Sequence, residues 1–151
     1  MNYFDFDILL KKKLQKLKKI YNLFGIKAEF EAEGSSVNDI IFLRKITSEC
    51  NTKLHVKIGG VEALNDIYNC IEIGVDGIIS PMVETKFGLH KFIESIKKLK
   101  LKRVPALSIN IETETGYKNL AEIIRSAKNN ISNITLGRSD FSESFFDKKI
   151  S

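Results

Sequence analysis

Two hydrophobic periodicities alternate along this chain, one typical of helices and one typical of strands. Over residues 8–24 apolar residues recur at steps of three and four with lysines between them, which predicts a helix that ends at Gly25. These apolar residues are Leu10, Leu14, Leu17, Tyr21 and Phe24. The next stretch, Ile26 to Gly34, alternates apolar and polar residues, which predicts a strand.

The same alternation of elements continues to the end of the chain. Further helices are expected over about residues 37–49, 61–72, 86–99 and 117–128. Further strands are expected at 54–58, within 75–83, at 104–111 and at 131–136. Ser36 and Asp39 resemble a capping box, and Gly74 is expected to end the helix before it. Strands that alternate regularly with helices favour right-handed βαβ units and a parallel sheet.

Two of these strand ends carry a carboxylate, and one helical segment separates them. Glu112 ends the run from Ile109, and Asp140 ends the run from Ile134. Neighbouring parallel strands would place both carboxylates at the carboxyl edge of the sheet, where α/β proteins build their sites. Two hard oxygen donors predict a Mg²⁺-type ion with positions open for substrate. The alternative is that each carboxylate caps the following helix.

Composition indicates an ordinary globular domain with a local excess of positive charge. The chain has 151 residues, of which 43% are hydrophobic and 28% charged, and its formal net charge is +5. Lysines 11, 12, 13, 16, 18 and 19 carry much of that excess and are expected to form a solvated helix face. The alternative is that these lysines bind an anionic polymer or an acidic lipid surface. Nucleic-acid binding is not expected, because the chain lacks Trp, an RNA-binding aromatic motif and zinc-ligand spacing.

The cysteines and the apolar runs bear on location. Cys50 and Cys70 are isolated and fit no metal or redox motif, so a reducing, cytoplasmic setting is expected. No apolar run reaches the length of a membrane span, and the first ten residues lack the basic region of a secretory signal.

Polar residues at the strand ends favour a barrel over a doubly wound sheet. The first strand is followed by Glu-Ala-Glu-Gly-Ser-Ser, and the chain contains neither a dinucleotide-binding glycine motif nor a Walker loop. The expected fold class is α/β: a partial (β/α)8 TIM barrel of about five parallel βα units with an N-terminal helix, forming one incomplete domain over residues 1–151. A whole barrel needs about 200 to 250 residues. An open arc would expose its sheet edges and an apolar inner layer.

Five segments, in order, resemble the HpcH/HpaI-type aldolase and citrate lyase β-subunit family of metal-dependent TIM barrels. They cover about residues 27–142. The segments are Lys27-Ala-Glu-Phe-Glu-Ala-Glu-Gly34, Val56-Lys-Ile-Gly-Gly60, Gly77-Ile-Ile-Ser-Pro-Met-Val-Glu-Thr85, Ile111-Glu-Thr113 and Leu136-Gly-Arg-Ser-Asp-Phe-Ser142. The resemblance implies that Glu112 and Asp140 ligate Mg²⁺ or Mn²⁺. It also implies a carbon–carbon lyase that cleaves a 2-oxo acid or an acyl-CoA-type thioester through an enolate that the metal stabilises. A homo-oligomer is expected.

The resemblance also suggests substrate-binding residues. The family commonly has an arginine where this chain has Lys57, which offers a point charge rather than a bidentate fork. Lys57 is expected to hold the substrate carboxylate or neutralise the enolate oxygen, without forming a Schiff base. Gly59 and Gly60 would permit close backbone approach. Gly137 and Arg138 would offer backbone N–H groups and a charge.

The general base is unassigned, because the aldolase branch has an acidic–histidine pair where this chain has none. Glu31 and Glu33 are the candidates, and His55 and His90 are expected to be structural. Glu84 is expected at the rim of the site. The alternative to an enzyme is a non-catalytic truncated barrel, or one part of a split barrel that works only by association.

Overall fold

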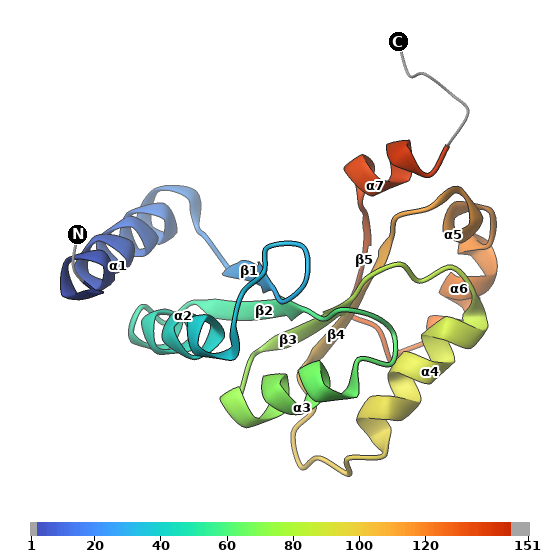
Figure 1. Ribbon diagram of the computed structural model, residues 1–151, viewed down its shortest axis with the longest axis horizontal. Coiled ribbons are helices and arrows are strands. Elements are labelled where there is room, and N and C mark those ends of the chain that lie inside the picture. Colours follow the sequence, from blue (N-terminus) through green and yellow to red (C-terminus); the bar gives the residue numbers. More distant parts are fainter. Residues whose placement is uncertain (1–2, 146–151) are drawn as a thin grey trace.

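A computed structural model describes residues 3–145 of the chain, with side chains from residue 5 onward. Strands and helices alternate after a first long helix (Figure 1). In chain order they are α1 (Tyr3–Tyr21), β1 (Gly25–Glu29), α2 (Val37–Glu49), β2 (Lys53–Lys57), α3 (Leu64–Ile73), β3 (Gly77–Ser80), α4 (Lys86–Lys97), β4 (Ala106–Ile111), α5 (Glu114–Lys118), α6 (Leu120–Ala127), β5 (Asn133–Leu136) and α7 (Arg138–Glu143).

The five strands form one parallel sheet in the order β1-β2-β3-β4-β5. Each strand pairs with the next one along the chain, and Figure 1 shows α2, α3, α4 and α6 on one face of the sheet. This arrangement is a half-barrel of βα units, as the alternation of patterns predicted. All five strands run the same way, so their carboxyl ends lie along one edge.

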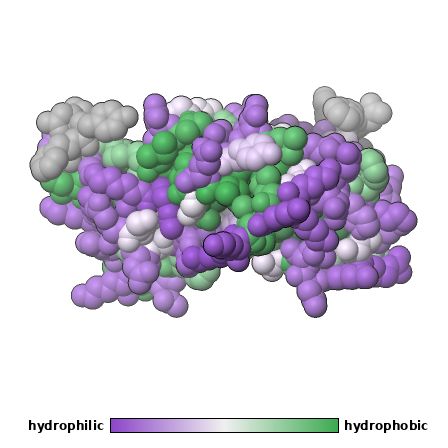
Figure 2. All heavy atoms as spheres, turned by 90° about the horizontal axis from the view of Figure 1, so that it is seen from below, coloured by the Kyte–Doolittle hydropathy of each residue, from purple (hydrophilic) through white to green (hydrophobic). Residues whose placement is uncertain are grey.

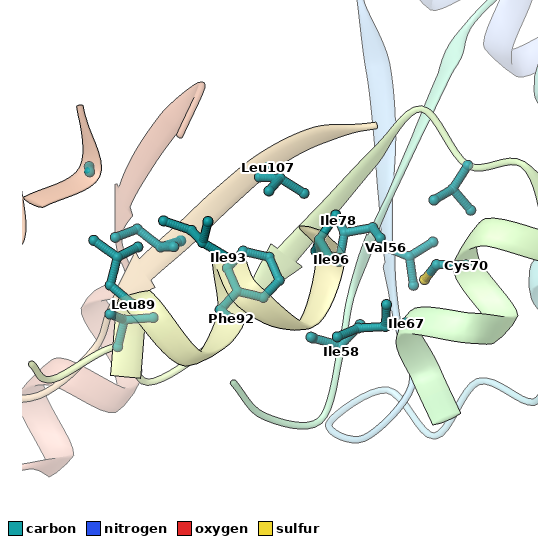
Figure 3. Packing of buried hydrophobic residues seen from close by; sticks show 14 of the residues in the cluster. Val56, Ile58, Ile67, Cys70, Ile78, Leu89, Phe92, Ile93, Ile96 and Leu107 are labelled. Atoms are coloured by element: carbon teal, nitrogen blue, oxygen red, sulfur yellow. The ribbon is translucent and has the colours of Figure 1, made fainter. Parts of the chain in front are cut away.

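The core lies between the sheet and the outer helices. Leu54, Val56 and Ile58 alternate along β2 and its end and are almost fully buried. Figure 3 shows Val56, Ile58 and Ile78 from the strands packed against side chains of α3 and α4. Burying such side chains contributes about 1.5–3 kcal/mol each. This layer therefore holds the strand ends in place.

The other face of the sheet is mostly polar, so the expectation of an apolar inner layer was wrong. His55 and Lys57 alternate with the core residues of β2 and so face away from the helices. Ser108 and Asn110 do the same on β4 and are buried. β2 and β4 therefore alternate apolar toward the helices and polar toward the concave side, whereas β3 places Ile79 on the concave side.

Several local predictions are confirmed, and others need correction. Ser36 and Asp39 form a reciprocal capping box at the start of α2, and Gly74 ends α3 with a φ of 72°. Gly25, however, does not end α1, which stops at Tyr21. Gly25 belongs to β1, where a Cβ would lie 2.9 Å from the Lys53 backbone oxygen. The predicted helix over 117–128 is two helices, α5 and α6, that meet at Asn119.

The outer face of the helices is partly apolar. Figure 2 shows apolar residues in the middle of the face seen from below Figure 1, with polar residues around them. Val37 and Ile41 of α2 and Leu64 and Tyr68 of α3 are the exposed large apolar side chains of those two helices. Within residues 3–145 none of the helices combines the length and apolarity that crossing a membrane requires.

Candidate active site

Glu112 is a buried carboxylate at the carboxyl end of β4. Its side chain is 3% exposed and accepts two hydrogen bonds, from the Met82 backbone N–H (3.1 Å) and from Asn110 Nδ2 (2.9 Å). Both donors are neutral, and no ion pair to Glu112 is found among residues 5–145. The cap of α5 is Thr113, whose hydroxyl accepts from the Gly116 N–H, so Glu112 is not a helix cap. A buried carboxylate without a contacting cation is costly unless something else supplies positive charge.

The end of β5 lies directly against Glu112. The Gly137 N–H donates to the Ile111 carbonyl (3.0 Å), and a Cβ on Gly137 would lie 2.5 Å from Glu112 Cγ. Asp140 follows in the first turn of α7 and is partly buried, while Arg138 is exposed. The N-cap position belongs to Gly137, so Asp140 does not cap this helix. The predicted Gly137 N–H donor is therefore already engaged within the fold.

Lys57 extends from the end of β2 and pairs with Glu29 of the adjacent strand. Glu29 and Lys57 are direct neighbours in the β1–β2 register, and Lys57 Nζ lies 2.7 Å from Glu29 Oε2. Both side chains are largely buried, at 12% and 9% exposure. The acid that contacts Lys57 is thus Glu29, rather than the Glu31 or Glu33 singled out from the sequence.

The charges around Lys57 come from β1, from the end of β4 and from α7. Burial lowers the pKa of Lys57, but the Glu29 contact and the fields of Glu29, Glu112 and Asp140 together raise it above its usual value. Burial likewise opposes ionisation of Glu29, yet Lys57 and Lys27 hold the pKa of Glu29 below its usual value. Lys57 therefore remains an ammonium at neutral pH, which makes it an electrostatic group and a poor base.

The other predicted residues line a separate cleft beside this cluster. A Cβ on Gly59 would lie 2.8 Å from Glu31 Cγ, and the Gly59 N–H donates to Asp66 Oδ2 (2.8 Å). Glu31, Gly59, Gly60 and Asp66 line a cleft of about 600 Å³. Glu33 is exposed on the loop that follows β1. A catalytic role for Glu31 or Glu33 stays a prediction.

Sequence reasoning missed Asn110 and Glu29. The signal for Asn110 was its place two residues before Glu112, because a strand puts such residues on the same face. Glu29 belonged to the same alternating run as Glu31 and Glu33, but β1 ends at Glu29, so only Glu29 is held beside Lys57. The end of a strand is difficult to place from sequence.

The histidines lie away from this cluster. The His55 ring packs against Gly77, where a Cβ would meet it, and edge-on to Phe24 at 6.2 Å between ring centroids. Burial lowers the pKa of His55. His90 is exposed on α4, and Glu84 accepts a hydrogen bond from the Thr113 hydroxyl (2.7 Å).

Glu112 and Asp140 are carboxylates, the ligand type that a hard divalent cation prefers, and their role as a metal-binding pair stays a prediction. In the part of the chain that the structure describes, no group of three or more histidine, cysteine or acidic side chains is placed to hold a metal. A two-carboxylate site suits Mg²⁺ or Mn²⁺, which keep several positions for water or substrate. Each Glu112 oxygen accepts one hydrogen bond from a neutral donor and keeps a lone pair for a cation.

Comparison with solved structures shows the same fold. An HpcH/HpaI aldolase/citrate lyase family protein from Burkholderia cenocepacia J2315 superposes with a TM-score of 0.73 at 12% identity, over 89% of this chain and 63% of that one. The citrate synthase SbnG gives 0.70 at 16% identity, over 90% and 60% of the two chains. The HpcH/HpaI aldolase from Desulfitobacterium hafniense DCB-2 gives 0.68 at 13% identity, over 88% and 60%. The chain thus spans about 60% of the length of these proteins.

Comparison by sequence adds the family. The curated proteins include no significant match to this chain. The profile of the HpcH/HpaI aldolase/citrate lyase family matches residues 35–149, which is most of the chain and includes Lys57, Glu112 and Asp140. The chain therefore belongs to the HpcH/HpaI aldolase/citrate lyase family.

Proposed function

We propose that this chain carries the site of a divalent-metal-dependent carbon–carbon lyase, acting on a 2-oxo acid or an acyl thioester. The observation that supports this most is the Glu112 carboxylate, which is 3% exposed and, among residues 5–145, contacts only neutral donors. Glu112 and Asp140 would hold Mg²⁺ or Mn²⁺. When bound, the ion would supply the positive charge that favours an enolate over a ketone.

The chain's own residues would orient the substrate around that position. Lys57 offers a fixed ammonium, held by Glu29 on one side and attracted by Glu112 and Asp140 on the other. Such a charge draws the carboxylate of a 2-oxo acid into the site and favours charge that develops on its oxygen. Arg138 at the start of α7 adds a second, exposed cation for an anionic group. The base that starts bond cleavage is not Lys57, because it stays protonated.

The test is calorimetric titration of the folded chain with Mn²⁺, with and without oxalate as an enolate mimic. We expect Mn²⁺ to bind and oxalate to tighten the binding. Glu112→Gln and Asp140→Asn should each weaken Mn²⁺ binding at least tenfold. Glu122→Gln is the matched control, because Glu122 is a half-exposed carboxylate on α6 that pairs with Lys86. Equal Mn²⁺ affinity in all four proteins would exclude the proposed metal site.

A second candidate is a half-barrel that works only in association with further strands. The observation that favours it is the open sheet, in which β1 and β5 each pair on one side only. Unpaired edges are templates for strand addition. Sedimentation velocity over a concentration series would detect self-association. A monomer that binds Mn²⁺ and oxalate at all concentrations would exclude the need for association in binding.

A further inference from the structure

Met82 has a backbone conformation that its neighbours in the chain do not explain. Its φ is 51°, in the left-handed region that side chains other than glycine rarely adopt. In residues 3–145 the other non-glycine residues with positive φ are Asn22, Asn51, Lys100 and Lys128, and each lies within three residues of a helix end. A left-handed residue is the ordinary way to end a helix. Met82 instead follows strand β3.

The hydrogen bonds of this loop explain the exception. The strained conformation directs the Met82 N–H to Glu112 Oε2 (3.1 Å), and the next N–H, of Val83, donates to the Asn110 carbonyl (3.1 Å). Two successive amides thus bind the end of β4. Glu112 therefore owes one of its two hydrogen bonds to a residue that holds an unfavourable φ.

The Met82 side chain is also unusual in its exposure. Pro81 and Val83 on either side of it are buried, whereas Met82 is 47% exposed. Its Cβ is only two bonds from the nitrogen that touches Glu112, so the side chain begins within a few ångströms of that carboxylate. A flexible, apolar thioether therefore begins close to the Glu112 carboxylate and is half exposed to solvent. Methionine adapts to irregular apolar shapes.

We infer that Met82 contacts the apolar part of the substrate and selects for its length. This rests on the proposed function, because the polar head of a 2-oxo acid at Glu112 would leave its alkyl chain at the rim. The strained loop would then have two roles at one residue. Its N–H orients Glu112, and its side chain covers the group that extends from the reacting carbons.

The experiment compares Met82→Ala with Met82→Gly. Both variants remove the thioether and keep the N–H, but only glycine accepts a positive φ without strain. Calorimetry in the presence of Mn²⁺ would measure the affinities for oxalate, pyruvate and 2-oxohexanoate. In the wild type 2-oxohexanoate should bind about fivefold more tightly than pyruvate, as expected when on the order of 40 Å² of apolar surface leaves water. Both variants should lose this preference and keep the oxalate affinity within about twofold.

Lys100→Ala and Lys100→Gly form the matched control pair. Lys100 has nearly the same φ, 49°, but lies beyond the end of α4. Each glycine variant should melt at a higher temperature than its alanine counterpart, and only the Met82 variants should change ligand preference. A preference for 2-oxohexanoate that survives in both Met82 variants would overturn the inference.

The same titrations separate this inference from the proposed function. If the wild type binds oxalate, pyruvate and 2-oxohexanoate with equal affinity, the metal site stands and the role of Met82 is overturned. If it binds none of them, the proposed function fails, and the inference that rests on it fails as well.

Discussion

Two buried carboxylates at opposite ends of the strands are held in different ways. Asp76, before β3, accepts from Arg44 Nη1 (2.7 Å), Lys53 Nζ (2.9 Å) and the Leu54 N–H (3.1 Å). Within the described residues Glu112, after β4, accepts only from a backbone N–H and an amide. Asp76 is therefore fully compensated within the chain, and Glu112 is oriented without being neutralised.

This difference indicates which end of the sheet is built for stability and which for chemistry. Asp76 borders a hollow of about 570 Å³ at the strand starts. The volume of this hollow is a poor guide to function, because the two cations beside it, Arg44 and Lys53, already pair with Asp76. In barrels of this class the strand starts serve stability and the strand ends carry sites. The charge balance of the two carboxylates follows the same division.

The largest effect on stability is expected at Asp76. Asp76→Asn would leave Arg44 and Lys53 without their shared carboxylate, and breaking a buried pair typically costs about 3–5 kcal/mol. Because the Arg44 and Lys53 side chains are 29% and 45% exposed, we expect a loss nearer 2 kcal/mol, measured by urea unfolding. Glu122→Gln, at an exposed pair, serves as control and should leave the unfolding free energy unchanged. An equal loss of stability in the two variants would contradict the conclusion that the ion pairs of Asp76 stabilise the fold.

Gly137 offers a test of how tightly the Glu112 end is built. A Cβ at Gly137 would lie 2.5 Å from Glu112 Cγ and 2.6 Å from Oε1, so Gly137→Ala must displace a buried side chain. Overpacking of this kind costs about 1–3 kcal/mol. Gly60→Ala is the control, because a Cβ there would meet nothing within 4 Å. We expect Gly137→Ala alone to lower the denaturation midpoint and to weaken Mn²⁺ binding.

The sequence was sufficient for the order of the elements and for placing Glu112 after β4 and Asp140 after β5, because both depend on local patterns. The role of the two carboxylates as metal ligands stays a prediction. Periodicity located every strand of the sheet, and the Ser36–Asp39 cap needs only three residues of separation. It was insufficient for the pairing of Lys57 with Glu29, which depends on the register between two strands. Glu29, Glu31 and Glu33 alternate with apolar residues in the same way, so the pattern does not indicate which of the three belongs to the strand.

The role of Met82 was equally hidden, for a different reason. A positive φ at a methionine runs against its intrinsic preference, so propensity argues against the observed conformation. The contact that stabilises this conformation comes from Glu112, thirty residues further along the chain. Sites violate local rules where distant contacts outweigh them, and this loop is such a place.

The pH dependence of stability should report the two acids that have cationic partners. Burial opposes ionisation of Asp76, but Lys53, the Leu54 N–H and Arg44 together hold the pKa of Asp76 below its usual value. Burial likewise opposes ionisation of Glu29, but Lys57 and Lys27 hold the pKa of Glu29 below its usual value. Both acids thus stabilise the fold at pH above their unfolded pKa values, which are 3.8 and 4.5. This contribution should disappear as the pH falls through the lowered folded pKa values. Urea unfolding between pH 6 and pH 2 would measure it, and Asp76→Asn should flatten the curve.

The smallest effect on stability is expected at Glu112, although the effect on binding there is the largest. Glu112→Gln removes a buried charge that feels the field of Lys57 but has no ion-pair partner among residues 5–145, and the amide oxygen can still accept one of the two hydrogen bonds. We therefore expect the unfolding free energy without metal to change by less than about 1 kcal/mol. Mn²⁺ should raise the melting temperature of the wild type and leave that of the variant unchanged, because an ion that binds only the folded state stabilises it by mass action. A metal-free stability loss as large as that of Asp76→Asn would mean that both carboxylates are structural, and the contrast between the two ends of the sheet would disappear.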